Sequence, residues 1–271
     1  MIEVDPPTLS GARFEEILGA DGWRKFDANL IEAGHCLSGR TIWHVNSTMT
    51  GGGVAELLTS AVGYLRGASI ATRWKVIGGH DEFFAVTKRI HHMLHGKRGD
   101  GGGLGEGERA VYDAVLDKEG AELTCEITAG DVVVLHDPQV AGLAPRLSER
   151  GAVVIWNCHV GADVSNTYTQ QAWRFLASAV RVASMTVFSR KSYVWDNLDP
   201  TKVAVIPPCI DAFSPKNQDL AGVGAALSAT GIIPSAHEGQ ATFTRTDGSA
   251  AAVIARAEML EARPVPQDAM V

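Results

Sequence analysis

Short runs of β-branched residues alternate with helical stretches through most of this chain. The runs expected as strands are residues 41–45, 70–77, 131–135, 152–156, 185–188 and 203–206. The stretches with apolar residues at helical spacing are residues 14–33, 54–65, 83–94, 108–116 and 167–182. Because strands that alternate with helices form parallel sheets covered on both faces, we predict an α/β fold.

Composition narrows the classes of function. The chain has 271 residues, 45% of them hydrophobic, so it can bury a sizeable core. Its formal net charge of −7 argues against nucleic acid as a partner, since a phosphate backbone repels an acidic protein. No apolar run approaches the roughly 18–20 residues that span a bilayer, and the first residues, MIEVDPPTLSGARFEE, lack the pattern of a signal peptide. We therefore expect a cytoplasmic protein with no membrane partner. The four Cys residues are far apart with no CxxC pair and are expected to be reduced thiols.

Two stretches depart from the alternating pattern. Residues 96–107 are so rich in glycine that we expect a mobile surface loop. After Asn217 the chain becomes rich in Ala, Gly, Ser and Thr, with one short helical pattern over residues 250–261. Pro207 and Pro208 halt the last expected strand and indicate a hinge. We predict a domain over residues 1–217 and a C-terminal extension over residues 218–271.

A run of three glycines, Gly51, Gly52 and Gly53, joins the first predicted strand to a helix. Such a turn lets backbone N–H groups and a helix N-terminus approach an anion or a sugar hydroxyl. It is not a dinucleotide fingerprint, because Glu56 stands where a third glycine is needed, and no GK[ST] follows. The alternative is a tight turn with a purely structural role.

The predicted helix over residues 83–94 has two different faces. One face, expected in the core, carries Phe83, Thr87, Ile90 and Leu94. The adjacent polar face carries Phe84, Lys88, His91 and His95. His91 and His95 have the i, i+4 spacing of a metal-binding pair, but no HExxH glutamate accompanies them. A solvated basic face is the favoured interpretation.

Histidines follow two of the predicted strands. His136 and Asp137 come directly after residues 131–135, and His159 comes shortly after residues 152–156. Because ligands of open parallel sheets bind beyond the carboxyl ends of the strands, these residues indicate binding of a polyhydroxylated ligand or acid–base chemistry. A nucleophilic Cys158–His159 pair is disfavoured, since neighbours in a strand point in opposite directions. No GxSxG motif is present to suggest a serine hydrolase.

Taken in order, five segments resemble the N-terminal half of the trehalose synthases of the glycosyl-transferring type. The segments are HVNSTMTGGGVAELL, RWKVIGGHDEFFAVTKRIHHMLHG, VVVLHDPQVAGL, IWNCHVGAD and VAVIPPCIDAFSPKN. That family consists of retaining glycosyltransferases of family four with the GT-B fold. The resemblance implies a Rossmann-like acceptor-side domain belonging to a two-domain enzyme. The enzyme would transfer glucose from an NDP-glucose to a second glucose, forming trehalose in the cleft between the domains.

The resemblance also implies roles for particular residues. Gly52 and Gly53 would approach the phosphates or the sugar of the donor. The residues implied near the acceptor sugar are Phe83, Thr87, Lys88 and His91. The catalytic residues lining the cleft would be His136, Asp137 and His159. A transition state with oxocarbenium character and a departing diphosphate needs oriented dipoles, so we expect no catalytic metal and no cofactor.

The resemblance implies a C-terminal half that holds the donor through an Arg, a Lys and a Glu-x7-Glu pair. Counting eight residues on from Glu258 gives Pro266, and from Glu261 gives Ala269, so the pair is absent here. We therefore expect this chain to be inactive or very weakly active alone. Two alternatives stay open: a trehalose phosphorylase-like enzyme, and a non-catalytic sugar-binding or dimerisation module. The sequence also leaves open the donor nucleotide and whether the chain forms a homodimer.

Overall fold

The structure, a computed structural model, describes residues 1–214, 217, 242–244 and 250–252. The chain divides into two compact units, Met1–Cys209 and Ile210–Val271, and each is described by itself. No helix among the described residues is long and apolar enough to cross a membrane.

The first unit is built on a seven-stranded sheet with the strand order β1-β3-β2-β4-β5-β6-β7. Its strands are β1 (Ile2–Val4), β2 (Ile42–Asn46), β3 (Thr72–Val76), β4 (Val132–His136), β5 (Val153–Cys158), β6 (Met185–Phe188) and β7 (Val203–Val205). All neighbouring strands pair in parallel except β1, which runs antiparallel to β3 at the sheet edge. The predicted parallel sheet is confirmed. β1 is absent from the predicted strands because three residues are too few to show a periodicity.

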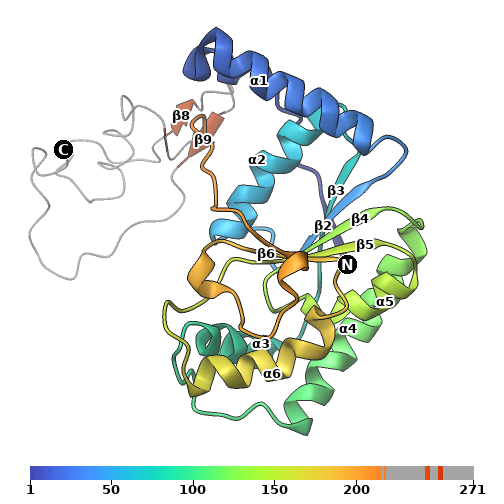
Figure 1. Cartoon of the computed structure of the whole chain (residues 1–271), viewed down its shortest axis with the longest axis vertical. Helices are drawn as coiled ribbons and strands as arrows, with labels where there is room; N and C mark the ends of the chain where they lie inside the picture. The colour runs from blue at the N-terminus through green and yellow to red at the C-terminus, as the bar shows by residue number, and fades with distance from the viewer. Residues whose placement is uncertain (215–216, 218–241, 245–249, 253–271) are drawn as a thin grey trace, which may run out of the picture. The chain divides into compact units, whose positions relative to one another are not determined.

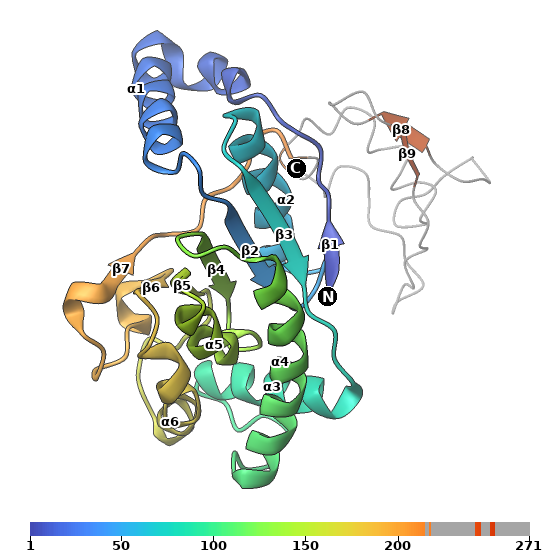
Figure 2. The ribbon, with the colours of Figure 1, turned by 90° about the vertical axis from the view of Figure 1, so that its right-hand side faces the viewer.

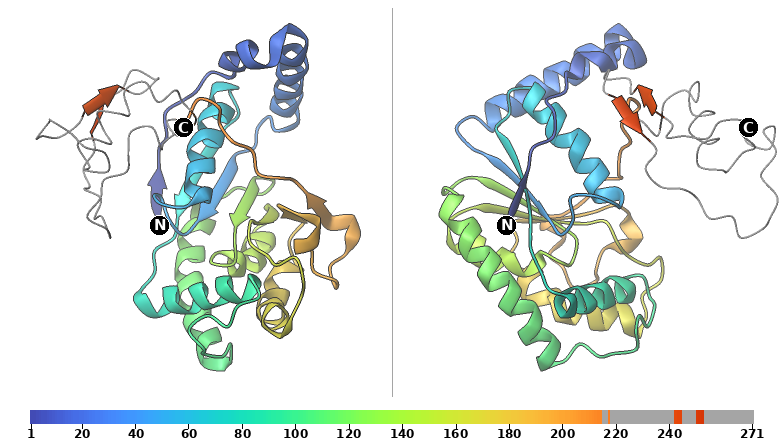
Figure 3. Two further views of the ribbon diagram at one scale, coloured as in Figure 1. Left: turned by 90° about the vertical axis from the view of Figure 1, so that its left-hand side faces the viewer. Right: turned by 180° about the vertical axis from the view of Figure 1, so that it is seen from behind.

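Helices cover both faces of the sheet. They are α1 (Glu15–Cys36), α2 (Gly53–Gly67), α3 (Asp81–Leu94), α4 (Glu106–Glu126), α5 (Ala144–Glu149) and α6 (Thr167–Val180). Short 3-10 helices span Gly11–Phe14, Ala141–Leu143, Lys191–Tyr193 and Pro200–Lys202. Figure 1 shows α1 and α2 on one side of the sheet and α3 to α6 on the other, and the views in Figures 2 and 3 agree. This arrangement confirms the predicted Rossmann-like α/β fold.

The packing follows from the alternation of side chains along each strand. On β2, Trp43 and Val45 belong to the main core, together with buried residues of α3, α4 and α6. Ile42, the residue before Trp43, lies in a separate cluster that includes Ala33 and Leu37 near the end of α1. In a third cluster, Leu58 of α2 packs with Trp74 of β3. Each helix layer therefore has its own apolar contact with the sheet.

Two helices differ from the sequence prediction. α4 continues to Glu126, well beyond the predicted residues 108–116. The apolar pattern is interrupted by Glu119, which is buried and accepts a hydrogen bond from the Gly78 N–H at 3.0 Å. α5 is not predicted because its six residues are too few for a helical period.

The glycine-rich segment between α3 and α4 is anchored by Arg89. The guanidinium of Arg89 donates to both carboxylate oxygens of Asp100, at 2.6 and 2.9 Å, and to the Gly103 carbonyl at 2.6 Å. It also donates to Glu108 of α4 at 3.0 Å. The predicted surface loop thus has a fixed point of attachment on α3.

In the second unit, β8 (Thr242–Thr244) pairs antiparallel with β9 (Ala250–Ala252). The helix predicted over residues 250–261 is therefore wrong for its first three residues, because Ala250–Ala252 form a strand. Residues 253–261 lie outside the described residues. The predicted boundary between residues 217 and 218 stays a prediction.

Candidate functional site

The predicted catalytic residues meet at the carboxyl ends of two neighbouring strands, β4 and β5. β2, β4 and β5 are adjacent in the sheet, and His136 of β4 lies opposite Asn157 of β5. Asp137 directly follows β4, and His159 directly follows β5. The structure thus brings His136, Asp137 and His159 together at the edge where open parallel sheets bind ligands.

Asp137 is held by hydrogen bonds from its main chain and from its side chain. Its N–H donates to the Asn157 carbonyl at 2.9 Å, and its own carbonyl accepts the indole N–H of Trp156 at 3.0 Å. Its carboxylate accepts the backbone N–H of His159 at 2.7 Å. Asp137 also has a positive φ of 64°, which few residues other than Gly, Asn and Asp adopt. Asp137 therefore fixes the conformation of the segment that carries His159.

Burial raises the pKa of Asp137 above its ordinary value, against the opposing effect of the nearby His159 ring and its N–H. A carboxyl group with a raised pKa at a strand end is a candidate for proton transfer. The same group also has the structural role just described.

A third histidine, absent from the sequence prediction, completes a line of rings. His44 Nδ1 lies 3.0 Å from His136 Nε2, and His136 Nδ1 lies 3.1 Å from His159 Nε2. The rings of His136 and His159 are stacked at an interplanar angle of 11°. Burial lowers the pKa of His44 to about 4, and burial with the neighbouring rings lowers the pKa of His136 well below its ordinary value. Both are neutral imidazoles at pH 7.

The glycine turn between β2 and α2 is organised by Asn46. The Asn46 side chain donates to the Thr48 carbonyl at 2.7 Å and accepts the indole N–H of Trp74 at 2.8 Å. Gly52 has a φ of 100°, so the turn itself requires glycine there. Gly53 is also exposed but has no positive φ, and a Cβ added to it would meet nothing within 4 Å. The backbone conformation therefore explains glycine at position 52, whereas neither packing nor backbone conformation requires glycine at position 53.

The four predicted acceptor-side residues of α3 do not share one environment. Phe83 is fully buried, and its ring stacks on Tyr112 with centroids 6.0 Å apart. Thr87 is also buried, and its hydroxyl donates to the Phe84 carbonyl at 3.3 Å. Phe83 and Thr87 thus form part of the core face of α3, with no exposed surface for contact with a sugar. Lys88 is exposed and His91 half-buried, so these two are the accessible members of the set.

The last turn of α3 contacts the segment that follows β5. The Nδ1–H of His95 donates to the Gly161 carbonyl at 3.1 Å, and the His91 ring lies edge-on to the His95 ring at 4.8 Å. Burial lowers the pKa of His91 to about 4, with smaller effects from His95 and His92. Among the described residues, no group of three or more His, Cys, Asp or Glu side chains is placed to hold a metal ion. The helix end therefore places the His95 imidazole against the segment after β5, near enough to Asp137 to affect its pKa.

Cys158 belongs to the core rather than to the site. Its thiol is fully buried and donates to the Val160 carbonyl at 3.2 Å. Burial raises the pKa of this thiol well above its ordinary value, so it stays protonated. This agrees with the preference against a Cys158–His159 nucleophile pair.

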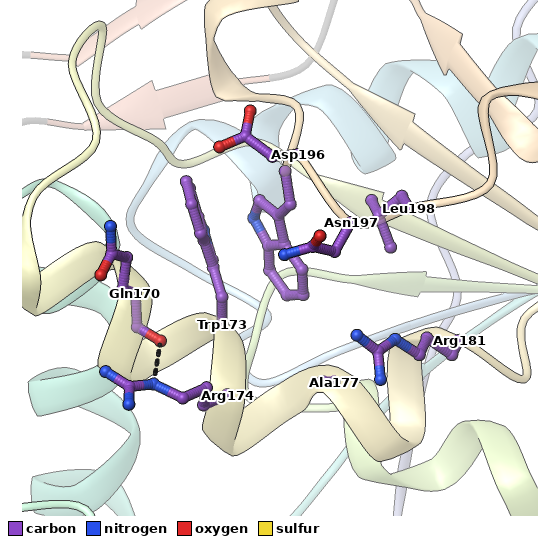
Figure 4. Close-up of a pocket in the computed structure, with 9 residues that line it drawn as sticks. Gln170, Trp173, Arg174, Ala177, Arg181, Asp196, Asn197 and Leu198 are labelled. Atoms are coloured by element: carbon purple, nitrogen blue, oxygen red, sulfur yellow. Dashed lines mark hydrogen bonds between the residues drawn. The ribbon is translucent and has the colours of Figure 1, made fainter.

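A pocket of about 310 Å³ lies away from these residues, between α6 and the segment after β6. In Figure 4 the side chain of Trp173 projects from α6 toward the loop that follows β6. Trp195 belongs to this loop, and the ring centroids of Trp173 and Trp195 are 5.7 Å apart. None of the residues predicted for the site lines this pocket.

The segment that contains these strand ends matches a family of known proteins. A model of the family described as "Trehalose synthase, N-terminal domain" matches residues 44–195. A trehalose synthase of Thermococcus litoralis is 34% identical over 220 residues, which are 81% of this chain and 51% of that protein. The chain thus spans about half the length of the curated relatives it matches.

Two more distant proteins are similar as well. A trehalose phosphorylase of Pleurotus pulmonarius is 26% identical over 188 residues, covering 65% of this chain and 25% of that protein. A solved α,α-trehalose-phosphate synthase (UDP-forming) of Burkholderia vietnamiensis has a TM-score of 0.48 and 15% identity, covering 71% of this chain and 52% of that one. Because the family match spans more than half of the chain and includes all three histidines of the line, this chain belongs to the trehalose synthase N-terminal domain family.

Proposed function

We propose that this chain is the N-terminal part of a retaining glycosyltransferase that transfers glucose from an NDP-glucose to glucose and forms trehalose. A C-terminal domain would bind the donor nucleotide, and this chain alone would be inactive or very weakly active. The observation that carries the proposal is the family match over residues 44–195, which contains the glycine turn and every predicted strand-end residue. We expect the enzyme to act in the cytoplasm.

Groups at the strand ends and on α2 and α3 support this proposal, because the reaction would use groups of their kind. Departure of a diphosphate builds up negative charge, which backbone N–H groups at the N-terminus of α2 stabilise when Gly52 and Gly53 allow close approach. Lys88, which is exposed, would supply a positive charge, and the half-buried His159 would supply an imidazole to the reacting sugar. His91 and His95 would bind hydroxyl groups of the acceptor. Oriented groups of this kind lower the barrier because they need no rearrangement as charge develops.

The experiment is a trehalose assay with two protein samples. One sample is the purified 271-residue chain, and the other adds the C-terminal half of a related trehalose synthase, supplied separately or fused behind residue 217. With NDP-glucose and glucose as substrates, we expect turnover only in the second sample. Robust trehalose formation by the chain alone would overturn the proposed dependence on a second half.

A phosphorylase-like activity is the second candidate, because of the similarity to the Pleurotus trehalose phosphorylase. The chain together with the added C-terminal half is called the completed enzyme. As a phosphorylase, the completed enzyme would release glucose 1-phosphate from trehalose only when inorganic phosphate is present. Phosphate-dependent release without any synthesis from NDP-glucose favours the phosphorylase. Glucose binding with neither activity in the completed enzyme favours a non-catalytic sugar-binding module.

A further inference from the structure

Three imidazoles form one line that runs from the interior of the sheet to its carboxyl edge. His44 is the third residue of β2, His136 the last residue of β4, and His159 the first residue after β5. Their nitrogen atoms are joined by separations of 3.0 and 3.1 Å, which are hydrogen-bond distances. His44 and His136 are buried, whereas His159 is half-buried and is the most exposed member of the line.

The hydrogen bonds in this line have a direction. A neutral imidazole carries one N–H donor and one bare nitrogen that accepts. His44 and His136 are both neutral, because burial keeps their pKa values below neutrality. His136 contacts a ring on each side, so it accepts from one neighbour and donates to the other. The choice of direction at His44 therefore sets the proton position at His159.

The surroundings of His44 decide between the two directions. His44 Nε2 is buried and has no hydrogen-bond partner among the described residues. In one direction this nitrogen carries the proton and becomes a buried N–H with no acceptor, which folded proteins rarely tolerate. In the other direction it is a bare nitrogen, and the His44 proton is on Nδ1, where it is donated to His136. The second arrangement has the lower cost.

We infer that His44 is a positioning residue that fixes the tautomer of His159 through His136. The Nδ1–H of His44 donates to His136 Nε2, and the Nδ1–H of His136 donates to His159 Nε2. The Nε2 of His159 is thereby occupied as an acceptor, and its proton is held on Nδ1. Among the described residues, His159 Nδ1 makes no hydrogen bond, so this N–H is available to donate to an acceptor oxygen of a bound ligand, such as a sugar hydroxyl or a phosphate. The ligand assignment rests on the proposed function, whereas the tautomer does not.

The tautomer is measured on the 271-residue chain without substrate. The chain is labelled with ¹⁵N-histidine, and long-range ¹H–¹⁵N spectra at pH 7 report which ring nitrogen of each histidine carries the proton. The His159 signals are assigned as those missing from the His159→Gln variant. We expect His159 to be protonated on Nδ1 and His44 likewise. A His159 protonated on Nε2 overturns the inference, even if the chain proves to be part of a trehalose synthase.

Variants of His44 test whether this residue sets the proton position. His44→Phe removes the donor but fills the space, and we expect the His159 signals to change from one tautomer to a mixture of both. His44→Gln retains an amide donor and should restore the single tautomer. His35→Phe, on the exposed end of α1, is the matched control and should leave the His159 signals unchanged. A single Nδ1–H tautomer that persists in folded His44→Phe overturns the role of His44. If that variant does not fold, the tautomers of the unsubstituted chain still decide.

Discussion

The carboxylate of Asp137 accepts the backbone N–H of His159 across an N···Oδ1 distance of 2.7 Å. This contact joins the end of β4 to the end of β5, and it is made by a residue with a φ of 64°. Asp137 therefore combines an unusual backbone conformation with a hydrogen bond that positions His159. The two contributions are separable by substitution.

Asp137→Ala should lower the free energy of unfolding by about 2–3 kcal/mol, because it removes the acceptor and places Ala at a positive φ. Asp137→Asn should lose less than about 1 kcal/mol, since Asn tolerates this φ and retains a side-chain oxygen. Denaturant unfolding of the two variants gives the comparison. Equal losses would mean that the acceptor and the backbone preference contribute nothing here.

Asp131 is the corresponding anchor at the opposite ends of the strands. It is buried, and its carboxylate accepts from the Thr41 N–H at 2.9 Å, the Thr128 N–H at 3.0 Å and the Trp43 indole at 3.0 Å. We expect Asp131→Ala to cost about 3 kcal/mol of stability, because it leaves buried donors unpaired. Asp117→Ala is the control: its side chain is 72% exposed and pairs with Arg146, so the loss should stay below about 0.5 kcal/mol.

Stability should fall as the pH drops from neutrality toward 4. The folded-state pKa of His44 is lowered to about 4 by burial, and that of His136 is lowered well below its ordinary value by burial and by the adjoining rings of His44 and His159. Between pH 6.5 and 4 the unfolded chain binds protons that the folded chain does not. The stability present above pH 6.5 is therefore lost as the pH falls through this window.

For His44 alone the loss is on the order of 3 kcal/mol at pH 4. Urea unfolding at pH 7, pH 5 and pH 4 measures this loss, and His44→Phe should show a flatter dependence on pH. The contribution of Asp131 to stability is lost in a lower pH range. Burial acts to raise the pKa of Asp131, but its three hydrogen bonds lower it below the ordinary value, so its contribution disappears only as the pH falls below about 4. A stability that does not change between pH 7 and pH 5 contradicts the burial of neutral histidines.

The sheet was predictable from the sequence because its strands are runs of β-branched residues separated by clear turns. The contact of His44 with His136 was not predictable from the sequence, for a physical reason. All five residues of β2 are buried, so the strand shows no alternation that distinguishes its two faces. The partner of His44 is also 92 residues away, so no local pattern reports the contact.

The α3 residues present the converse case. Helical spacing correctly places Phe83 and Thr87 on the core face, and both are buried. Their predicted contact with an acceptor sugar comes from a resemblance of sequence segments. Such a resemblance does not distinguish residues that pack beneath a site from residues that line it. The adjacent face, with Lys88 and His91, is the accessible one.

Gly52 and Gly53 form a matched pair for testing the glycine turn, since an added Cβ meets nothing within 4 Å at either position. Gly52→Ala should cost about 1–2 kcal/mol of stability because of its φ of 100°. Gly53→Ala should cost none, and the gain should be at most about 1 kcal/mol, because Ala is favoured over Gly in a helix. In the completed enzyme, both variants should raise the KM for NDP-glucose if the backbone approaches the donor. An unchanged KM in Gly53→Ala would leave the turn with a structural role only.

His159→Ala in the completed enzyme should lower kcat on the order of 10²-fold or more, which is typical for loss of one oriented group at a centre of developing charge. The KM for glucose should change far less, because the interaction strengthens mainly in the transition state. His35→Ala, at an exposed position of α1, serves as the control and should leave both constants unchanged. Steady-state kinetics at pH 7 separates these effects.

Since His159 is held by Asp137 on its main chain and by His136 on its ring, Asp137→Ala should reproduce part of the loss in kcat. A His159→Ala enzyme with an unchanged kcat would remove His159 from the reacting centre, and would leave Asp137 and His136 as structural supports of the strand ends.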